Sequence, residues 1–306
     1  MRIMGIETTG AFASVALLET EEPKNTSAQP ARIDVIHGND RFSHLQNLTP
    51  QIRQLLDRHG LTVQDMDGIA VSRGPGSFTG IRIGVSTARA LSQVTGIPCI
   101  PVSSLEALAL RGADLLLKPD GKATLLGAAA PEDILICPIL DARRTQVYAG
   151  GYRLKPAEPE GGEPIIDEVI PAESYLMEEF LDRIEWESPV LFLGDGIDTC
   201  GEIIRRRRDV VEEPGEAAGG DGTAVFAAKE DRYQDASTVA RLGLRLLEEG
   251  CTCGYMELEP EYMRMAEAER KLRQRQRQQA QAGGPEGDRQ AQAGGPETGR
   301  EEQRHG

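Results

Sequence analysis

The segment SRGPGSFTGIRIG, residues 72–84, joins a short apolar run to a long helical pattern through a turn rich in glycine. Such a turn lets a strand feed directly into a helix, because glycine adopts backbone conformations that other residues avoid. Residues 68–72 are predicted as the strand and residues 79–95 as the helix. Ser77 or Thr79 is available to cap the first helical turn. The segment therefore favours an α/β protein.

The turn matches none of the common glycine patterns of phosphate-binding or catalytic sites. The third glycine of a dinucleotide fingerprint would fall at Thr79, and a Walker A motif would need Lys then Ser or Thr where Ile81 and Arg82 stand. Ser77 lacks the flanking glycines of a nucleophile elbow. A structural role is therefore predicted for the motif. Its residues are Gly74, Pro75, Gly76, Ser77, Phe78, Thr79, Gly80 and Arg82.

The spacing of apolar residues predicts two sets of strands and helices along the chain. The first set comprises strands at 2–7, 12–19, 33–37 and 98–102 and helices at 41–58 and 79–95. The second set comprises a helix at 104–111, strands at 134–140, 145–154, 165–170 and 190–193, and a helix at 172–183. A helix after the turn GDG and a last helix at 236–249 complete the pattern.

The composition changes near residue 268. From there the chain has almost no apolar side chains beyond alanine, and the octet QAQAGGPE occurs at 279–286 and again at 290–297. Such a segment cannot bury enough apolar surface to offset the entropy lost on ordering. We predict that residues 267–306 form a disordered, low-complexity tail.

Charge and cysteine content restrict the function and the compartment. The net charge of −15 disfavours direct binding of nucleic acid by this chain alone, and the four arginines at 205–208 are interpreted as a solvated helix end. Five scattered cysteines without a zinc-binding arrangement favour a reducing compartment. No apolar run approaches the ~20 residues of a membrane span, and the N-terminus lacks a signal-peptide pattern. We expect a cytoplasmic protein without membrane contact.

Six segments, in this order and spacing, resemble the TsaB (YeaZ) family. They are IMGIETTGAFASVALLE (3–19), FSHLQNLTPQIRQLL (42–56), IAVSRGPGSFTGIRIGVSTARALSQVTGIPCIPVSSLEALA (69–109), PILDARRTQVYAGGY (138–152), LGDGI (193–197) and EPEYMRMAE (259–267). In the last segment Met263 replaces the usual Leu of the family. The resemblance covers about residues 1–266 and is most specific in the glycine-rich turn.

The resemblance implies a two-lobed ASKHA fold, actin-like and RNase H-like. Its first lobe would comprise residues 1–103 with 232–266, and its second lobe residues 104–231. It also implies a non-catalytic partner of TsaD and the ATPase TsaE, which attach a threonylcarbamoyl group to the adenosine beside the anticodon of tRNA. Contact with tRNA would be indirect, through the complex, and a homodimer is left open. Insertions at 21–30 and 118–133 and the tail depart from the family pattern.

A catalytic metal is not expected from the histidines. The sequence has no pair of histidines one helical turn apart, which a two-histidine metal site on a helix requires. The family's relative TsaD carries such a pair on the helix that corresponds to 41–58. This chain has His44 there, but Leu48 stands where the second histidine would be needed. We therefore expect no bound metal and no cofactor.

The helix at 79–95 carries more apolar and small residues than one packing face needs. Its polar residues, Arg82, Ser86, Arg89 and Gln93, cluster in a narrow sector. We expect the large side chains Ile83, Leu91 and Val94 to pack on the sheet and the small residues to face another helix. The small residues are Gly84, Ala88 and Ser92. The helix at 41–58 is one candidate for that neighbour; the resemblance favours a partner protein, with His44 in the same interface.

Two other functions are weighed against a scaffold role. A stand-alone ASKHA kinase acting on a metabolite would use Glu7, Asp141 and Asp195, which stand at predicted strand ends beside turns, as magnesium-associated carboxylates near the cleft between the lobes. A glycoprotease-type peptidase lacks a nucleophile and base in this sequence. The leading prediction is a scaffold or activating subunit without catalytic residues of its own.

Overall fold

The structure is a computed structural model that describes residues 1–20, 31–38, 44–118, 130–155, 163–211 and 222–263. Residues Met1–Arg264 form one compact unit. The insertion predicted at 21–30, most of the one at 118–133 and the tail lie outside the described residues. Within the described residues, no helix is both long and apolar enough to cross a membrane.

The first sheet is built from the N-terminal third of the chain. Its strands are β1 (Arg2–Glu7), β2 (Ser14–Glu19), β3 (Arg32–His37), β4 (Gly68–Gly74) and β5 (Cys99–Ser103), in the order β3-β2-β1-β4-β5. β1 pairs antiparallel with β2 and parallel with β4. The central strands β1 and β4 are buried on both faces, which explains why they appear as short, nearly continuous apolar runs.

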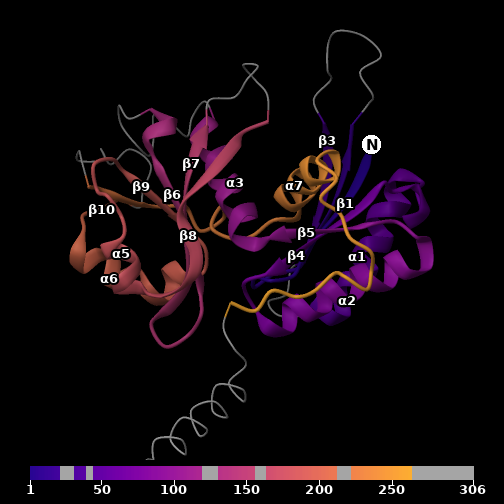
Figure 1. Cartoon of the computed structure of the whole chain (residues 1–306), viewed down its shortest axis with the longest axis horizontal. Coiled ribbons are helices and arrows are strands. Elements are labelled where there is room, and N and C mark those ends of the chain that lie inside the picture. Colours follow the sequence, from indigo (N-terminus) through magenta and orange to yellow (C-terminus); the bar gives the residue numbers. More distant parts are fainter. Residues whose placement is uncertain (21–30, 39–43, 119–129, 156–162, 212–221, 264–306) are drawn as a thin grey trace, which may run out of the picture. The chain divides into compact units, whose positions relative to one another are not determined.

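Helices cover both faces of this sheet (Figure 1). α1 (His44–His59) and α2 (Phe78–Thr95) pack on one face, and α7 (Ala236–Glu248) packs on the other. Alternate residues of β1 separate the two cores: Ile3 lies in the cluster with α7, and Met4 lies in the cluster with α1 and α2. This is the two-residue period expected of a strand.

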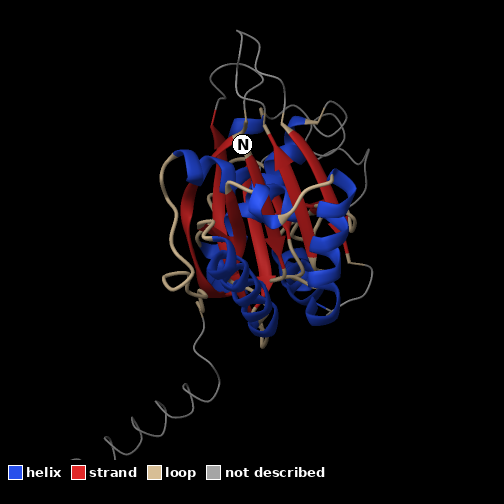
Figure 2. Ribbon diagram, turned by 90° about the vertical axis from the view of Figure 1, so that its right-hand side faces the viewer, coloured by secondary structure: helices blue, strands red, loops and turns tan. Residues whose placement is uncertain are grey.

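The second sheet packs against further helices, and it has one core cluster of its own and shares another with the first sheet. Its strands are β6 (Leu135–Asp141), β7 (Gln146–Lys155), β8 (Ile165–Leu176), β9 (Val190–Leu193), β10 (Val210–Val211) and β11 (Ala224–Phe226), in the order β10-β11-β9-β6-β7-β8. The helices that pack on it are α3 (Ser104–Leu117), α5 (Met177–Asp182) and α6 (Gly196–Arg207). Figure 2 shows the strands of the compact unit running between helices. The predicted α/β class is confirmed.

The second sheet also corrects part of the sequence prediction. Residues 172–176, predicted as the start of a helix at 172–183, continue β8, and only Met177–Asp182 are helical. Pairing with β7 decides this, since Tyr175 lies opposite Val147 and is 4% exposed. The short strands β10 and β11 have no counterpart in the prediction, because runs of two or three residues are too short to show a period.

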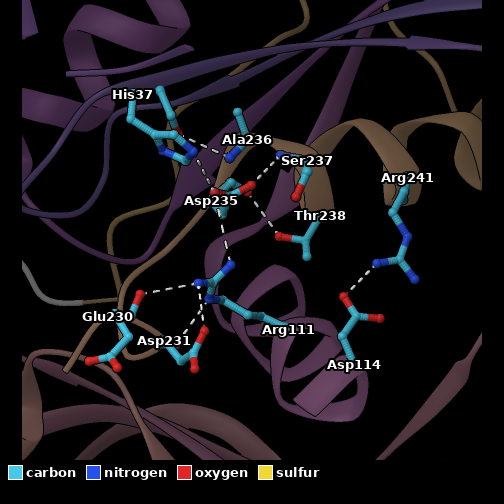
Figure 3. Close-up of polar contacts among 11 residues, drawn as sticks. His37, Arg111, Asp114, Glu230, Asp231, Asp235, Ala236, Ser237, Thr238 and Arg241 are labelled. Atoms are coloured by element: carbon cyan, nitrogen blue, oxygen red, sulfur yellow. Dashed lines mark hydrogen bonds and ion pairs between the residues drawn. The ribbon is translucent and has the colours of Figure 1, made fainter. Parts of the chain in front are cut away.

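Polar contacts join α3 to α7 and to the segment before it (Figure 3). Arg241 on α7 contacts Asp114 on α3 at 2.6 Å. Arg111 on α3 donates to the Asp231 carbonyl at 2.9 Å and to its carboxylate at 3.2 Å. Asp235 caps α7 by accepting a hydrogen bond from the backbone of Ser237 at 2.7 Å. These contacts connect the helix that packs on the second sheet to the helix that packs on the first.

Candidate functional site

The glycine-rich motif packs closely against the turn that follows β1. The Ser77 amide donates to the Thr9 carbonyl at 2.8 Å, and the Thr8 hydroxyl donates to the Gly80 carbonyl at 2.8 Å. A Cβ atom at Gly76, whose φ is +151°, would lie 2.6 Å from the Thr9 oxygen, and one at Gly80 would overlap the Thr8 oxygen. Only glycine permits this approach. The motif therefore holds a second turn of its own chain, where a phosphate loop would hold a ligand.

Ser77 also begins α2. Its hydroxyl accepts a hydrogen bond from the Gly80 amide at 3.3 Å, and this satisfies one of the free amides of the first helical turn. Of the two capping residues considered from the sequence, Ser77 is the one that the structure uses. The structural role of the whole motif stays a prediction.

Glu7, the first cleft candidate, lies at the buried end of β1. Its carboxylate accepts hydrogen bonds from the Thr9 amide at 2.5 Å, from the Thr9 hydroxyl at 2.6 Å and from the Ser72 hydroxyl. Complete burial raises the pKa of the Glu7 carboxyl above its ordinary value, while the bonds from Ser72 and Thr9 act in the opposite direction. The carboxylate is used inside the fold, to fix the turn that the glycine motif grips.

His44 and Leu48 lie on the inner side of α1. The His44 side chain is 2% exposed, and its Nε2 donates to the Gly10 carbonyl at 3.0 Å. Burial lowers the pKa of the imidazole, which keeps it neutral. Leu48 is 1% exposed and belongs to the apolar core beneath α1 and α2. Because the Leu48 side chain has no ligand atom, these two positions do not fit the two-histidine metal pair of TsaD.

Asp141 and Asp195, the other cleft candidates, meet at the ends of β6 and β9. The Asp195 carboxylate accepts a hydrogen bond from the Asp141 amide at 2.9 Å, and the Asp141 carboxylate accepts one from the Arg143 amide at 2.7 Å. Gln234 fills the space over Gly10, which lies between β1 and β2. A Cβ atom at Gly10 would lie 2.6 Å from the side-chain oxygen of Gln234. The structure joins the two aspartates to each other and gives Glu7 other partners.

The structure corrects the interpretation of α2. Its buried residues are Gly80, Ile81, Gly84, Val85, Ala88 and Ser92. The small residues therefore face the sheet: a Cβ atom at Gly84 would overlap the Thr8 hydroxyl, and the Ala88 carbonyl lies 3.8 Å from the Cys99 sulfur on β5. Val94, which was expected against the sheet, is 83% exposed. The small residues let α2 approach its own sheet closely and are closed to a partner, as is His44.

The C-terminal segment 251–263 runs back along the first sheet and α2. Cys253 exchanges two backbone hydrogen bonds of 2.9 Å with Cys99, and Leu258 is fully buried. The Glu261 amide then donates to the Arg73 carbonyl at 2.8 Å, next to the glycine motif. The glycine motif and the segment 251–263, far apart in the sequence, therefore lie side by side.

At this meeting point lies an aromatic–arginine cluster, which we define as Phe78, Arg82 and Tyr262. The two rings are 4.8 Å apart between centroids, and the Arg82 guanidinium lies 3.9 Å from the centroid of Phe78. Arg82 Nε donates to the Tyr262 hydroxyl at 3.0 Å. Sequence reasoning placed Phe78 and Arg82 in the motif but missed Tyr262; the available signal was that Tyr262 lies in EPEYMRMAE, one of the segments that resemble the family.

Comparisons with known proteins match this chain to TsaB and TsaD. The family model of TsaD, tRNA N6-adenosine threonylcarbamoyltransferase, matches residues 41–271. The tRNA threonylcarbamoyladenosine biosynthesis protein TsaB of Bacillus subtilis (strain 168) is 31% identical over 269 residues, which are 87% of this chain and 96% of that protein. A tRNA N6-adenosine threonylcarbamoyltransferase of Trichlorobacter lovleyi is 41% identical over 69 residues, 22% of this chain and 20% of that protein.

A solved structure shares the fold. YeaZ from Pseudomonas aeruginosa superposes with a TM-score of 0.59 and 23% sequence identity, covering 85% of this chain and 99% of that chain. This likeness extends over both sheets, so the two-lobed architecture expected from the sequence is confirmed.

Proposed function

This chain belongs to the TsaB (YeaZ) family, and from this membership we propose that it is the non-catalytic subunit that binds TsaD and TsaE in the complex that modifies tRNA. Like its family, this chain takes part in the biosynthesis of tRNA threonylcarbamoyladenosine. Its own task is that of a scaffold or activator, and tRNA is contacted through the complex. We also propose that the protein works in the cytoplasm.

The proposal rests on one observation: candidate site residues of this chain, Glu7 and His44, form hydrogen bonds within its own fold. Three donors from Thr9 and Ser72 bind the Glu7 carboxylate, and His44 bonds the Gly10 carbonyl. A phosphate-transferring site of this fold would need an accessible carboxylate and open space over the glycine of the first turn. Here Gln234, which is 7% exposed, packs against Gly10.

The stand-alone kinase is supported less well by the same contacts. Asp141 and Asp195 are brought together, but each accepts a backbone hydrogen bond at a turn, which is an ordinary structural use of an aspartate. Glu7 would have to lose three hydrogen bonds to take a magnesium-associated role. Hydrolysis of ATP by the purified chain alone, abolished in Asp195→Asn, would favour the kinase.

We propose that the partner surface is the outer face of α1 and α2, since their inner faces are closed by the sheet. Leu45 on α1 is 77% exposed and Val94 on α2 is 83% exposed, so the outer side of each helix offers an aliphatic side chain to a partner. A second copy of the chain would compete with TsaD for the same face. With the lobe boundaries that we propose at 103 and 231, both helices belong to the first lobe.

Co-purification tests the proposal. Affinity-tagged chain should retain TsaD and TsaE from the same organism, and threonylcarbamoyladenosine should form in tRNA only when all subunits are present. The chain alone should neither hydrolyse ATP nor form the product. Full product formation by TsaD and TsaE without this chain would overturn the proposed role.

A further inference from the structure

Arg82 is held in place with part of its guanidinium still available. The Phe78 ring supports one side of the group at 3.9 Å, and the Tyr262 hydroxyl fixes Nε at 3.0 Å. Among the described residues, no acceptor is found for the two terminal nitrogens of Arg82. A planar fork of two N–H donors is therefore presented at an exposed position without the entropy cost of ordering a free arginine.

The surroundings of Arg82 are positive in an otherwise acidic chain. α2 carries Arg82 and Arg89 and has no Asp or Glu, whereas the whole chain has a net charge of −15. Glu261, the acidic residue next to Tyr262 in the sequence, is already paired with Arg73 at 3.0 Å. The electrostatics at this point favour an incoming negative charge.

The shape of the free part of Arg82 favours one kind of negative group. The guanidinium lies 3.9 Å from the Phe78 centroid and 5.9 Å from the Tyr262 centroid, so both rings border it. The cluster offers the guanidinium fork beside two aromatic rings. A carboxylate matches the fork with two parallel hydrogen bonds. Phe78 at 40% and Tyr262 at 38% exposure add apolar area around it.

We propose that the aromatic–arginine cluster is an anchor of the complex, in which Arg82 receives a carboxylate of TsaD. This inference rests on the proposed function and adds to it a specific contact and the chemistry of the partner residue. Arginine flanked by aromatic rings is typical of the few residues that dominate binding at protein interfaces. The anchor needs two segments that are far apart in the sequence, since Tyr262 comes from the segment 251–263 and Arg82 from α2.

The test measures binding of purified TsaD from the same organism to variants of the full-length chain. Arg82→Lys keeps the charge but removes the fork, and we expect it to weaken binding at least about tenfold. Tyr262→Phe keeps the stacked ring but frees Nε, and we expect a smaller, several-fold loss. The matched control is Arg206→Lys, which makes the same change at an exposed arginine of α6. Melting temperatures of all variants should agree with the wild type.

The outcomes separate this inference from the proposed function. If the wild type fails to bind TsaD, both are overturned. If the wild type binds and Arg82→Lys binds equally well, only the anchor is overturned. If Arg82→Lys binds TsaD normally but the assembled complex loses affinity for tRNA, the cluster serves RNA, and the carboxylate contact is wrong. The anchor is supported if Arg82→Gln weakens binding to TsaD more than Arg82→Lys does. It is also supported if high salt removes the difference in affinity between the wild type and the variants, because salt screens the ion pair.

Discussion

At the residue scale, Glu7 is the group with the most unusual surroundings. It is a carboxylate with no exposed surface, held by a hydroxyl and an amide of Thr9 and by the hydroxyl of Ser72. Hydrogen bonds of this kind offset a large part of the cost of burying a charge, but desolvation is the larger effect and raises the pKa. Glu7 therefore fixes the turn after β1 at the expense of stability near neutral pH.

The pH dependence of unfolding tests this description. The folded state holds the Glu7 proton more tightly than the unfolded state, whose pKa is near 4.5, so the free energy of unfolding falls as the pH rises through the window above 4.5. Glu7→Gln removes the titration, and Ser72 can turn its hydroxyl to accept from the amide. Urea unfolding between pH 5 and 8 should show a shallower pH dependence in Glu7→Gln than in the wild type.

Glu230→Gln is the control for this comparison, because Glu230 is exposed. Its pH dependence should equal that of the wild type. An identical slope in the wild type and Glu7→Gln would mean that Glu7 titrates alike in the folded and unfolded states.

At the element scale, α2 shows how small residues act. Gly80, Gly84 and Ala88 face the sheet because the turn after β1 and the strand β5 come too close for larger side chains. The side of the helix that carries Val94 points outward. Helical spacing identified the two faces of α2, and the assignment of each face to sheet or partner depended on distances that spacing does not contain.

Two arginine substitutions on α2 separate its faces. Ala88→Arg places a charged side chain in a position with no exposed surface, and we expect it to destabilise the monomer by several kcal/mol. Val94→Arg adds the same charge at an exposed position, so the chain should melt normally but bind TsaD more weakly. Circular dichroism melting and a pull-down provide both measurements. A soluble, native-like Ala88→Arg protein would contradict the packing of α2.

At the scale of the whole molecule, the compact unit is closed by its own C-terminal segment. Leu258 completes the core under α1 and α2, and the contact of Glu261 with Arg73 fastens the segment beside the glycine motif. The apolar residues that hold the segment end with Met263, and the composition of residues 268–306 contains little that could be buried. Folding of the compact unit should therefore be independent of the tail.

Deletion of residues 268–306 checks this independence. We expect the melting temperature to stay within about 1 °C of the full-length value, because a loss of 1 kcal/mol would lower it by roughly 2–4 °C in a domain of this size. The same deletion should leave binding to TsaD unchanged, since Tyr262 is retained. A drop of several degrees would show that the tail contributes to the stability of the folded chain.

The sequence by itself determined the α/β class and the strands of the first sheet, and it limited the cap of α2 to Ser77 or Thr79. These features are local, since they depend on apolar period, glycine content and a side chain that bonds three residues ahead. The sequence alone also shows that Leu48 stands where the second histidine would be needed. The start of α5 could not be predicted from the sequence, because pairing with β7 overrides the helical pattern of residues 172–176.

Only the tertiary structure decided which residues meet across the chain. The contact of Arg82 with Tyr262 joins positions 180 residues apart, and the grip of Gly80 on Thr8 joins positions 72 apart. No local pattern encodes such a distance, since it results from the order of strands in the sheet and the path of the C-terminal segment. The partners of Glu7 and the burial of Ala88 follow from the same packing, which is why the sequence named these residues but misjudged their surroundings.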